Sequence, residues 1–588
     1  MAPLLDERAS ATTVLYADPH NPARHLTRGQ IHERLGFPDL AAADAYRALS
    51  LLDSVVDPDG CEFHARRRNE GVTFSEPPAQ KEDSGDVKDE DEEEDDDENN
   101  DPISEEEYRS LIGPVYALLV RSLVKCGCLR DAYEFALRGR TVLDEIETQN
   151  AEEESSVSDA KKDIEGQIAQ IKTQYRTSKG KEEEEREDIN PSALKAQGFA
   201  RRILYPWNEH EPDRKSPETL VLLNERLKDI APKCEVRAVA LPALHNQSTT
   251  KLDKKKEDSE DEEVSIQLGL FAKTPLAPGE TILHESSLLT ATNRLHDDLC
   301  DACNAPLPDL SSPNPPVACD ECYDTIFCST SCHDRAQEIY HGAVCGLMEN
   351  LEAIGKDIPD AKDKADYLYL LLLGRALAMA ETQGVHPLDL PEVKYIWGDF
   401  VPESEGQAQV PEGPSIGTLP FSFHLSILQP MRLIEEMQVD PYANLARYDT
   451  WVLNTLYAKF RGTASGRLST WDGGPETCAV HPLWCLANHS CDPNVRWGWG
   501  GEISFVVRGA EERAIWKRKD GEEKAVPGRG EGIKKDQEIL NHYCDIGLDV
   551  KERREWAAGA LGGKCLCDRC VWEAGAVDVT SCLDGLQI

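Results

Sequence analysis

Alternating apolar and polar residues predict a group of β-strands near the middle of the chain. The predicted strands are residues 234–241, 266–272 and 278–283, the last two separated by a turn. A helix precedes them, because Pro217 begins a periodic apolar stretch that continues to Leu227. Residues 200–247 therefore form a lead-in to a strand-containing region.

The N-terminal part has the period of packed helices, with Tyr116, Leu119 and Leu123 on one inward face. Small residues also recur where two helices would cross closely. They are Ala41 and Ala48 after Leu35-Gly36, and Ala132 and Gly139 after Cys126-Gly127. This spacing resembles the tetratricopeptide repeat, and an ordinary helical hairpin explains it almost as well. Both interpretations predict antiparallel helices.

Charged stretches interrupt this pattern. They are residues 71–107, 151–190 and 248–263, the first containing the acidic run 89–98. Such runs are typical of solvated insertions and linkers. Within the second stretch, Ile164, Ile168 and Ile171 have helical spacing and predict a charged helix.

Composition and net charge limit the classes of binding partner that we expect. A chain of 588 residues with 40% hydrophobic residues can bury several cores. Its net charge of -44 repels the phosphate backbone, so we expect no direct nucleic-acid binding and favour basic protein segments as partners.

No membrane or secretory segment is expected. The first ten residues lack an apolar core, and the longest apolar stretch, residues 367–380, is short for a bilayer and contains Arg375. We therefore predict an intracellular protein of the nucleus, the cytoplasm or both. In a reducing compartment the 19 cysteines favour metal ligation over disulfides.

Eight cysteine and histidine residues occur as four closely spaced pairs. The pairs are Cys300 and Cys303, Cys319 and Cys322, Cys328 and Cys332, and His341 and Cys345. This set predicts two tetrahedral zinc sites. The spacing is similar to that of a MYND zinc finger, which implies a cross-braced pairing. One ion would then take Cys300, Cys303, Cys328 and Cys332, and the other Cys319, Cys322, His341 and Cys345.

Acidic residues in this finger oppose the single Arg335, which argues for a protein partner over DNA. The MYND resemblance implies a proline-rich or other peptide partner.

Three further motifs follow the finger in order: Asn488-His489-Ser490-Cys491-Asp492-Pro493-Asn494, then Glu538-Ile539-Leu540-Asn541-His542-Tyr543, then Cys565, Cys567 and Cys570. Together they resemble the SET-domain protein lysine methyltransferases, and a finger placed before them is the order of the SET and MYND members. The resemblance covers about residues 264–570. It implies an S-adenosylmethionine site beside a narrow lysine channel.

The resemblance implies roles for single residues. Tyr543 would orient the substrate amine. Asn488 and His489 would hold the cofactor, with Gly269 and Leu270 at its other end. Asn454 stands near the place of a cofactor-contacting asparagine, and a capping or core role explains it equally well.

A third zinc ion is implied by the tail. Cys565, Cys567 and Cys570 are one ligand short of a tetrahedral site, and Cys491 matches the position that supplies the fourth ligand in the family. This ion would tie the C-terminal segment over the active site. The remaining cysteines, Cys544 among them, are expected to be ungrouped buried thiols.

Two departures from the family bear on activity. Gln267 stands where the family has the first glycine of Gly-x-Gly, and Gly563 replaces an aromatic residue near the cofactor. A charged insertion at residues 516–532 also precedes the Glu538 motif. We therefore keep two hypotheses: a protein-lysine N-methyltransferase acting on a histone or another protein, and a weak or inactive SET and MYND scaffold that mediates protein–protein interactions in transcriptional regulation.

The expected architecture is a multidomain α+β protein, in which a SET β-fold is split by a MYND finger and a helical insert and preceded by repeat-like helices. The expected domains are residues 1–70 and 108–150 (repeat-like helices), 71–107 (acidic insertion), 151–190 and 248–263 (charged linkers), 200–247 (lead-in), 264–298 (SET N-terminal part), 300–345 (MYND finger), 346–480 (helical insert), 481–547 (SET C-terminal part) and 548–588 (zinc tail).

Overall fold

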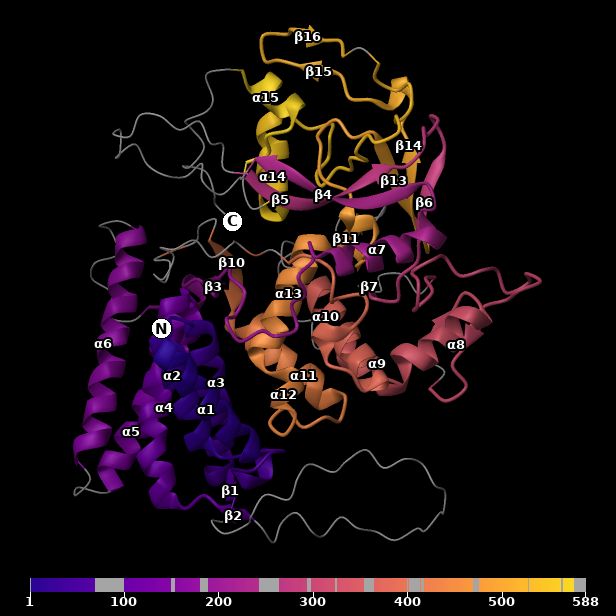
Figure 1. The fold of residues 1–588 in the computed structure, drawn as a ribbon. Coiled ribbons are helices and arrows are strands. Elements are labelled where there is room, and N and C mark those ends of the chain that lie inside the picture. Colours follow the sequence, from indigo (N-terminus) through magenta and orange to yellow (C-terminus); the bar gives the residue numbers. More distant parts are fainter. Residues whose placement is uncertain are drawn as a thin grey trace. The chain divides into compact units, whose positions relative to one another are not determined.

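The computed structural model describes most of the chain (Figure 1). The described residues are 2–68, 100–149, 154–179, 189–242, 264–292, 298–322, 325–353, 364–398, 400, 413, 417–468, 475–526, 528–561 and 564–575. The predicted acidic insertion up to residue 99, the linker at 248–263 and Gly563 lie outside them. The mixture of helix and strand confirms the predicted α+β class.

The chain forms two compact units, each assembled from separated stretches. The first contains Met1–Arg201, Ser404–Leu428 and Asp440–Thr450, and the second contains Arg202–Glu403, Gln429–Val439 and Trp451–Ile588. The insert expected as one piece at residues 346–480 is therefore divided between the units. The hydrophobic pattern carried no sign of this division.

Packed helices dominate the first unit. The long ones are α1 (Ala2–Ala17), α2 (Pro22–Arg34), α3 (Pro38–Val56), α4 (Glu105–Cys126), α5 (Leu129–Gln149) and α6 (Glu154–Lys179). The short elements are α12 (Leu445–Tyr448), η1 (Pro58–Gly60), η4 (Pro191–Ala193), the π-helix η9 (His424–Leu428), and the strands β1 (Arg66–Arg68), β2 (Asn100–Pro102), β3 (Gln197–Arg201) and β10 (Thr418–Ser422). β1 pairs antiparallel with β2, and β3 with β10.

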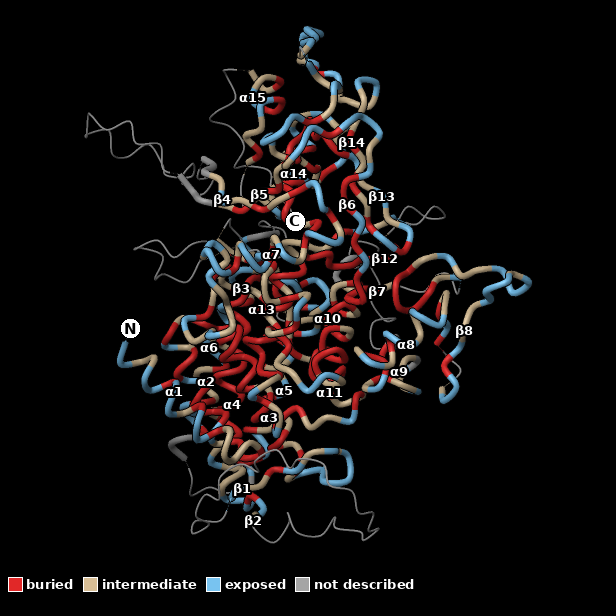
Figure 2. Tube along the Cα trace, turned by 45° about the vertical axis from the view of Figure 1, so that its right-hand side comes forward, coloured by how far each residue is buried: buried red, intermediate tan, exposed pale blue. Residues whose placement is uncertain are grey.

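Local signals set the ends of α4. Ser104 and Glu107 form a capping box at its start, and Gly127 ends it with φ of 77°, a left-handed conformation that glycine adopts at low cost. Small residues allow close crossings, as predicted. Ala41 and Ala48 are fully buried in α3, and a Cβ on Gly139 would lie 2.8 Å from the ring of Tyr116. Figure 2 shows buried residues concentrated along these helices.

The charged stretch at residues 151–190 contains the predicted helix. α6 packs against α4 and α5, and its Ile164 and Ile171 are fully buried. This part of the expected linker is thus a packed helix, because the isoleucines form an apolar stripe on an otherwise polar surface.

A buried charge cluster joins the N-terminal helices to residue 449. Arg28 on α2 donates to Asp44 on α3 at 3.0 Å and to Asp449 at 2.7 Å, and all three side chains are at most 3% exposed. Arg47 donates to Thr450 at 2.8 Å beside this cluster. Charges this deeply buried are tolerated because each has an opposite partner.

The second unit contains several small sheets, and its apolar core forms around them. Its strands are β4 (Cys234–Pro242), β5 (Val264–Ala272), β6 (Thr281–Glu285), β7 (Thr290–Thr292), β8 (Val317–Ala318), β9 (Ile326–Phe327), β11 (Ser465–Leu468), β12 (Pro475–Ala479), β13 (Val495–Trp499), β14 (Ile503–Val507), β15 (Trp516–Lys517) and β16 (Glu523–Lys524). β4 pairs with β5, and β14 lies between β13 and β6. Leu227, Leu270, Leu283 and Phe505 belong to one core that joins these sheets.

Helices complete the second unit. They are α7 (Pro217–Ile230), α8 (Thr330–Ile339), α9 (Met348–Ala353), α10 (Lys364–Gln383), α11 (Gln429–Glu436), α13 (Thr450–Thr463), α14 (Val550–Leu561), α15 (Asp568–Ala574), and the short η6 (His341–Ala343), η8 (Pro387–Asp389), η10 (Trp484–Leu486) and η11 (Ala510–Glu512). α7, β4, β5 and β6 confirm the elements predicted from hydrophobic periodicity. Among the residues that the structure describes, no helix combines the length and apolar character needed to cross a bilayer.

We expect Asp449→Asn to destabilise the first unit by about 3–5 kcal/mol, because it removes one buried charge and keeps the side-chain volume. The measurement is the opening free energy of α2 and α3 from hydrogen exchange. Asp53→Asn is the matched control, since Asp53 pairs with Arg138 at 2.7 Å on the exposed side of α3 and should change stability by at most about 1 kcal/mol. Equal effects of the two variants would contradict a role for the buried cluster.

Candidate metal centres and cofactor site

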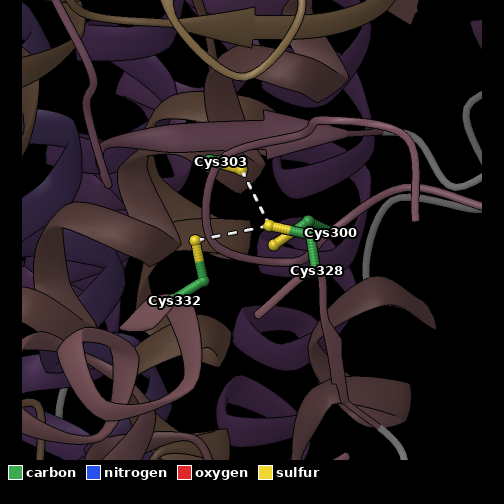
Figure 3. Close-up of side chains that lie close together, drawn as sticks. All are labelled: Cys300, Cys303, Cys328 and Cys332. Atoms are coloured by element: carbon green, nitrogen blue, oxygen red, sulfur yellow. Dashed lines mark hydrogen bonds between the residues drawn. The ribbon is translucent and has the colours of Figure 1, made fainter. Parts of the chain in front are cut away.

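The four ligands predicted for the first ion come together in the structure (Figure 3). The metal-binding atoms of Cys300, Cys303, Cys328 and Cys332 all lie within 4.8 Å of one another. The Cys328 sulfur is 3.8 Å from that of Cys303 and 3.6 Å from that of Cys332. Zinc–sulfur bonds of about 2.3 Å in a tetrahedron place sulfurs roughly 3.8 Å apart, so the spacing suits zinc.

The second predicted set converges as well. Cys319, Cys322, His341 and Cys345 form a group of the same size. The sulfurs of Cys319 and Cys345 are 3.9 Å apart, and His341 Nε2 lies 3.6 Å from the Cys322 sulfur. Because each group draws on both halves of the finger, the cross-braced pairing implied by the resemblance is the one that the structure contains.

The close spacing of the four sulfurs favours a bound cation. Burial, and next the neighbouring Cys300, raise the pKa of Cys328 to about 12. Several thiolates this close repel one another unless a cation compensates them, which a zinc ion does. The two groups could therefore each hold a zinc ion.

One arginine holds the finger against α10. Arg375 donates to the Asp301 carboxylate at 3.1 Å and to Leu288 O at 3.3 Å, and its guanidinium lies 3.7 Å from the ring centre of Tyr340. The Tyr340 hydroxyl donates to Asp301 at 2.6 Å. The finger is thus attached to the helical part of its unit by buried, charge-assisted contacts.

The tail cysteines form the third predicted group. Cys491 lies with Cys565, Cys567 and Cys570, their sulfurs all within 4.8 Å. The Cys491 sulfur is 3.3 Å from Cys570 and 4.0 Å from Cys565. The amide of Cys491 also donates to the Cys567 sulfur at 3.4 Å, a contact suited to a metal-bound thiolate.

A fifth cysteine lies beside this group. Cys544 was expected to be an ungrouped thiol, and that expectation is wrong, because its sulfur lies within 4.8 Å of Cys491 and His489. Its place directly after Tyr543 is the signal that could have revealed it, since the resemblance assigns Tyr543 to the same site as Asn488 and His489, which precede Cys491 in one motif.

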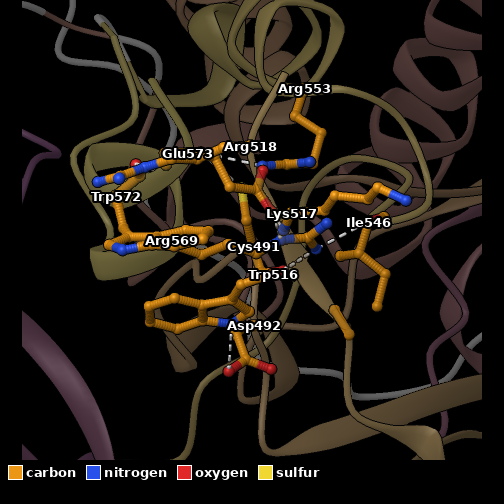
Figure 4. Close-up of polar contacts among 12 residues, drawn as sticks. Cys491, Asp492, Trp516, Lys517, Arg518, Ile546, Arg553, Arg569, Trp572 and Glu573 are labelled. Carbon is orange, nitrogen blue, oxygen red and sulfur yellow. Dashed lines mark hydrogen bonds and ion pairs between the residues drawn. The ribbon is translucent and has the colours of Figure 1, made fainter. Parts of the chain in front are cut away.

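The tail is held by two buried carboxylates, shown in part in Figure 4. Glu573 accepts from Arg569 at 2.8 Å and from the Lys517 amide at 3.1 Å, and pairs with Arg553. Asp492, next to Cys491, accepts from Arg513 at 3.1 Å, from Arg529 at 2.8 Å and from the Trp516 indole at 3.0 Å. The charged insertion at residues 516–532 therefore packs against the tail that contains Cys565, Cys567 and Cys570, a role that its composition did not predict.

The two central motifs lie side by side. His489 and Asn541 form a parallel bridge, in which the Ser490 amide donates to Asn541 O at 2.7 Å and the Asn541 amide to Asn488 O at 2.8 Å. Asn494 adds a side-chain bond from its amide to Glu538 O at 2.8 Å. The Ile539 amide donates to Leu270 O at 2.7 Å, so β5 borders the same segment.

Five of the six predicted cofactor and catalytic residues meet at this junction, all but Asn454. The side-chain nitrogen of Asn488 donates to Leu268 O at 3.0 Å and to the Glu538 carboxylate at 2.7 Å. Leu268 stands between Gln267 and Gly269 on β5. A Cβ on Gly269 would lie 2.7 Å from that carboxylate and 3.1 Å from the Asn488 side-chain nitrogen, so a larger residue would require these side chains to shift. Leu270 follows on the same strand.

Tyr543 closes the junction. Its hydroxyl donates to Ala487 O at 3.0 Å and its amide donates to His489 Nδ1 at 3.0 Å. Burial raises the pKa of Tyr543 well above its usual range, so the hydroxyl stays protonated. Burial lowers the pKa of His489 to about 4, which keeps the imidazole neutral.

Asn454 joins a different group. It lies on α13 and donates to the Tyr205 hydroxyl at 3.2 Å, beside the stacked rings of Tyr205 and Trp207. This contact agrees with the core role that the sequence left open for Asn454.

His210, His386 and Asp389 form another cluster that the sequence analysis missed. The two imidazole rings are stacked, with centres 3.8 Å apart and planes 5° from parallel. A metal binds in the plane of an imidazole ring, so parallel stacked rings cannot both bind one ion. The cluster is better described as a ring stack in which Asp389 accepts from His210 at 2.8 Å.

The Glu285 side chain is bonded to the main chain just before the 488–494 segment. Its carboxylate accepts from the amides of Leu483 at 3.1 Å and Trp484 at 2.7 Å, and the residue is 6% exposed. Burial outweighs these bonds and raises the pKa of Glu285 to about 7.

Comparison of the chain with protein-family models and with curated proteins finds no match to either.

The three four-ligand groups predict three zinc ions per full-length chain, counted by inductively coupled plasma mass spectrometry. We expect Cys303→Ser and Cys567→Ser each to remove one ion, because each leaves a three-ligand site of lower affinity. Cys61→Ser, a partly exposed cysteine outside these groups, should retain three. A wild-type chain that binds fewer ions would contradict the assignment of ligands.

The raised pKa of Glu285 predicts a pH effect on stability. The folded state holds this proton more tightly than the unfolded chain, whose Glu pKa is about 4.3, so the stabilisation is full below that value and is lost as the pH rises through about 7. Glu285→Gln keeps an acceptor oxygen without the charge. Its melting temperature relative to wild type should therefore be higher at about pH 8 than at about pH 5.5. The exposed Glu502→Gln should show no such dependence.

Proposed function

We propose that the chain is an S-adenosylmethionine-dependent protein-lysine N-methyltransferase acting on a histone or another protein. The observation that carries the proposal is the parallel bridge between His489 and Asn541, which brings Asn488 and Tyr543 to one junction beside β5. The same three motifs, in the same order, are the basis of the resemblance to the SET and MYND methyltransferases.

The cofactor would lie along β5 and the Asn488 segment. When bound, it supplies a methyl group on a positively charged sulfur. Glu538 is the nearest candidate for a compensating negative charge, since its carboxylate lies against Gly269 and accepts from Asn488 at 2.7 Å. Burial raises the pKa of Glu538, an effect that a nearby positive charge would offset.

The lysine amine would approach from the side of Tyr543. Methyl transfer is an in-line displacement, so the protein must align a neutral amine behind the methyl group and exclude water. The buried Tyr543 hydroxyl, already bonded to Ala487 O at 3.0 Å, has lone pairs that can accept from that amine and fix its direction.

The metal groups would support this site structurally. The donors are thiolates and one imidazole, the set that zinc prefers, and each group supplies four protein ligands. Zinc in the tail group would connect the C-terminal helices to Cys491, which lies two residues after His489. The finger, being acidic, would serve to bind a protein partner.

The alternative is a metal-bearing scaffold without methyl transfer, acting in protein–protein interactions of transcriptional regulation. Gln267, which pairs with Val239 across the β4–β5 ladder, supports this alternative, because its side chain emerges where the family has glycine. Cofactor binding separates the two functions, since a scaffold has no need of it.

Calorimetry with S-adenosylmethionine tests the proposal on the zinc-loaded chain. We expect binding to the wild type, and a loss of about tenfold or more in affinity for Asn488→Ala, which leaves Glu538 and the Leu268 carbonyl without their shared donor. No binding to the wild type would leave the scaffold as the function.

Methyl transfer from labelled cofactor to core histones and cell-extract proteins tests the chemistry. Tyr543→Phe should bind the cofactor normally and lose about tenfold or more in the rate of transfer, because only the hydroxyl that orients the amine is removed. Tyr457→Phe, on α13, is the matched control and should keep the wild-type rate. A Tyr543→Phe variant as active as the wild type would contradict the assigned role.

A further inference from the structure

His489 has both ring nitrogens engaged. Nδ1 lies 3.0 Å from the amide nitrogen of Tyr543, and Nε2 lies 3.3 Å from the sulfur of Cys491. The imidazole therefore stands between the main chain of the Tyr543 motif and the sulfur cluster of the tail. In the family resemblance this residue was expected to contact the cofactor instead.

The first contact fixes the position of the ring proton. A main-chain amide can only donate a hydrogen bond, so Nδ1 must act as the acceptor and carries no proton. A neutral imidazole then has its proton on Nε2, and that N–H points at the Cys491 sulfur. His489 is thus a donor to the sulfur and is not available as a metal ligand through Nε2.

This arrangement also argues against a second metal site formed by His489, Cys491 and Cys544, although the three lie close together. With Nε2 protonated, only two thiols of that group could bind an ion, fewer than zinc uses in proteins. The tail group of Cys491, Cys565, Cys567 and Cys570 remains the complete set.

We infer that His489 is a positioning residue that couples metal binding in the tail to the conformation of the Tyr543 segment, by donating to the Cys491 thiolate and accepting from the Tyr543 amide. Donors to metal-bound ligands stabilise their charge, and their removal typically weakens metal binding by about 10–100-fold. The inference depends on zinc in the tail group, and it rests on the proposed function only in the sense that Tyr543 would then be catalytic.

Two substitutions separate the two bonds of the ring. In His489→Asn the side-chain oxygen can take the place of Nδ1 and keep the acceptor for Tyr543, while the donor to Cys491 is lost. In His489→Gln the longer side chain can place an amide N–H near the position of Nε2, while the acceptor for Tyr543 is lost. Each variant therefore tests one half of the inference and serves as the control for the other.

The experiment uses the full-length, zinc-loaded chain and two readouts. The first is the rate of zinc transfer to a chromophoric chelator, with Cys567→Ser giving the baseline of the two finger ions. The second is hydrogen exchange at the Tyr543 amide, obtained from overlapping peptides by mass spectrometry.

We expect a crossed result. His489→Asn should release one zinc ion about tenfold faster or more and keep the Tyr543 amide protected, whereas His489→Gln should retain zinc and exchange that amide faster. Wild-type behaviour of both variants, or the same loss in both readouts for both variants, would overturn the inference. If one variant does not fold, the other decides alone, because the inference requires it to change one readout and keep the other at the wild-type value.

Neither readout requires methyl transfer. Failure of cofactor binding in calorimetry would refute the proposed function and leave the zinc and exchange results intact. An uncrossed result would refute the coupling by His489 and leave the methyltransferase proposal standing.

Discussion

The hydrogen bonds between the 488–494 and 538–543 segments are the constraint on which the second unit depends. They join main chain that is about fifty residues apart to β5, which lies far earlier in the sequence, through the bonds from Ser490 to Asn541 and from Ile539 to Leu270. Asn488 and Asn494 add side-chain amides that occupy carbonyl groups of the neighbouring segments. Buried polar groups are most stable when they have partners, which the side chains of Asn488 and Asn494 supply here, whereas the fully buried Asn541 side chain has no hydrogen-bond partner among the described residues.

The second unit also contains the cysteine and histidine groups that could hold zinc, and buried ion pairs. The strands of the finger and of the inserted hairpin contain only two residues each, too few to be stable alone. Thiolate groups fit for zinc can provide the missing stability, since structural zinc contributes on the order of 10 kcal/mol to small modules. Arg375 then attaches the finger to α10, and the Lys517 amide and the Arg518 side chain of the hairpin donate to Glu573 and to Trp572 O of the tail.

How much was predictable from the sequence differs between local and long-range features. The strand predicted at 266–272, the helix beginning at Pro217 and the spacing of the predicted metal ligands follow from periodicity and chemistry that act over a few residues. The placement of Asp449 against Arg28, and of β10 against β3, depends on pairings across hundreds of residues and left no local signal. The same holds for the inserted hairpin, whose charges are like those of a solvated loop until their partners in the tail are known.

The pairing of Arg28 with Asp449 has a consequence for folding during synthesis. These residues are separated by 421 positions, so at a translation rate of about 5–20 residues per second the guanidinium waits roughly 20–80 s for its second carboxylate. During that interval the nascent helices are exposed to chaperones with an incompletely neutralised interior. A chain that ends before residue 404 would lack β10 and Asp449, and its first unit would lose the stabilisation that these parts supply.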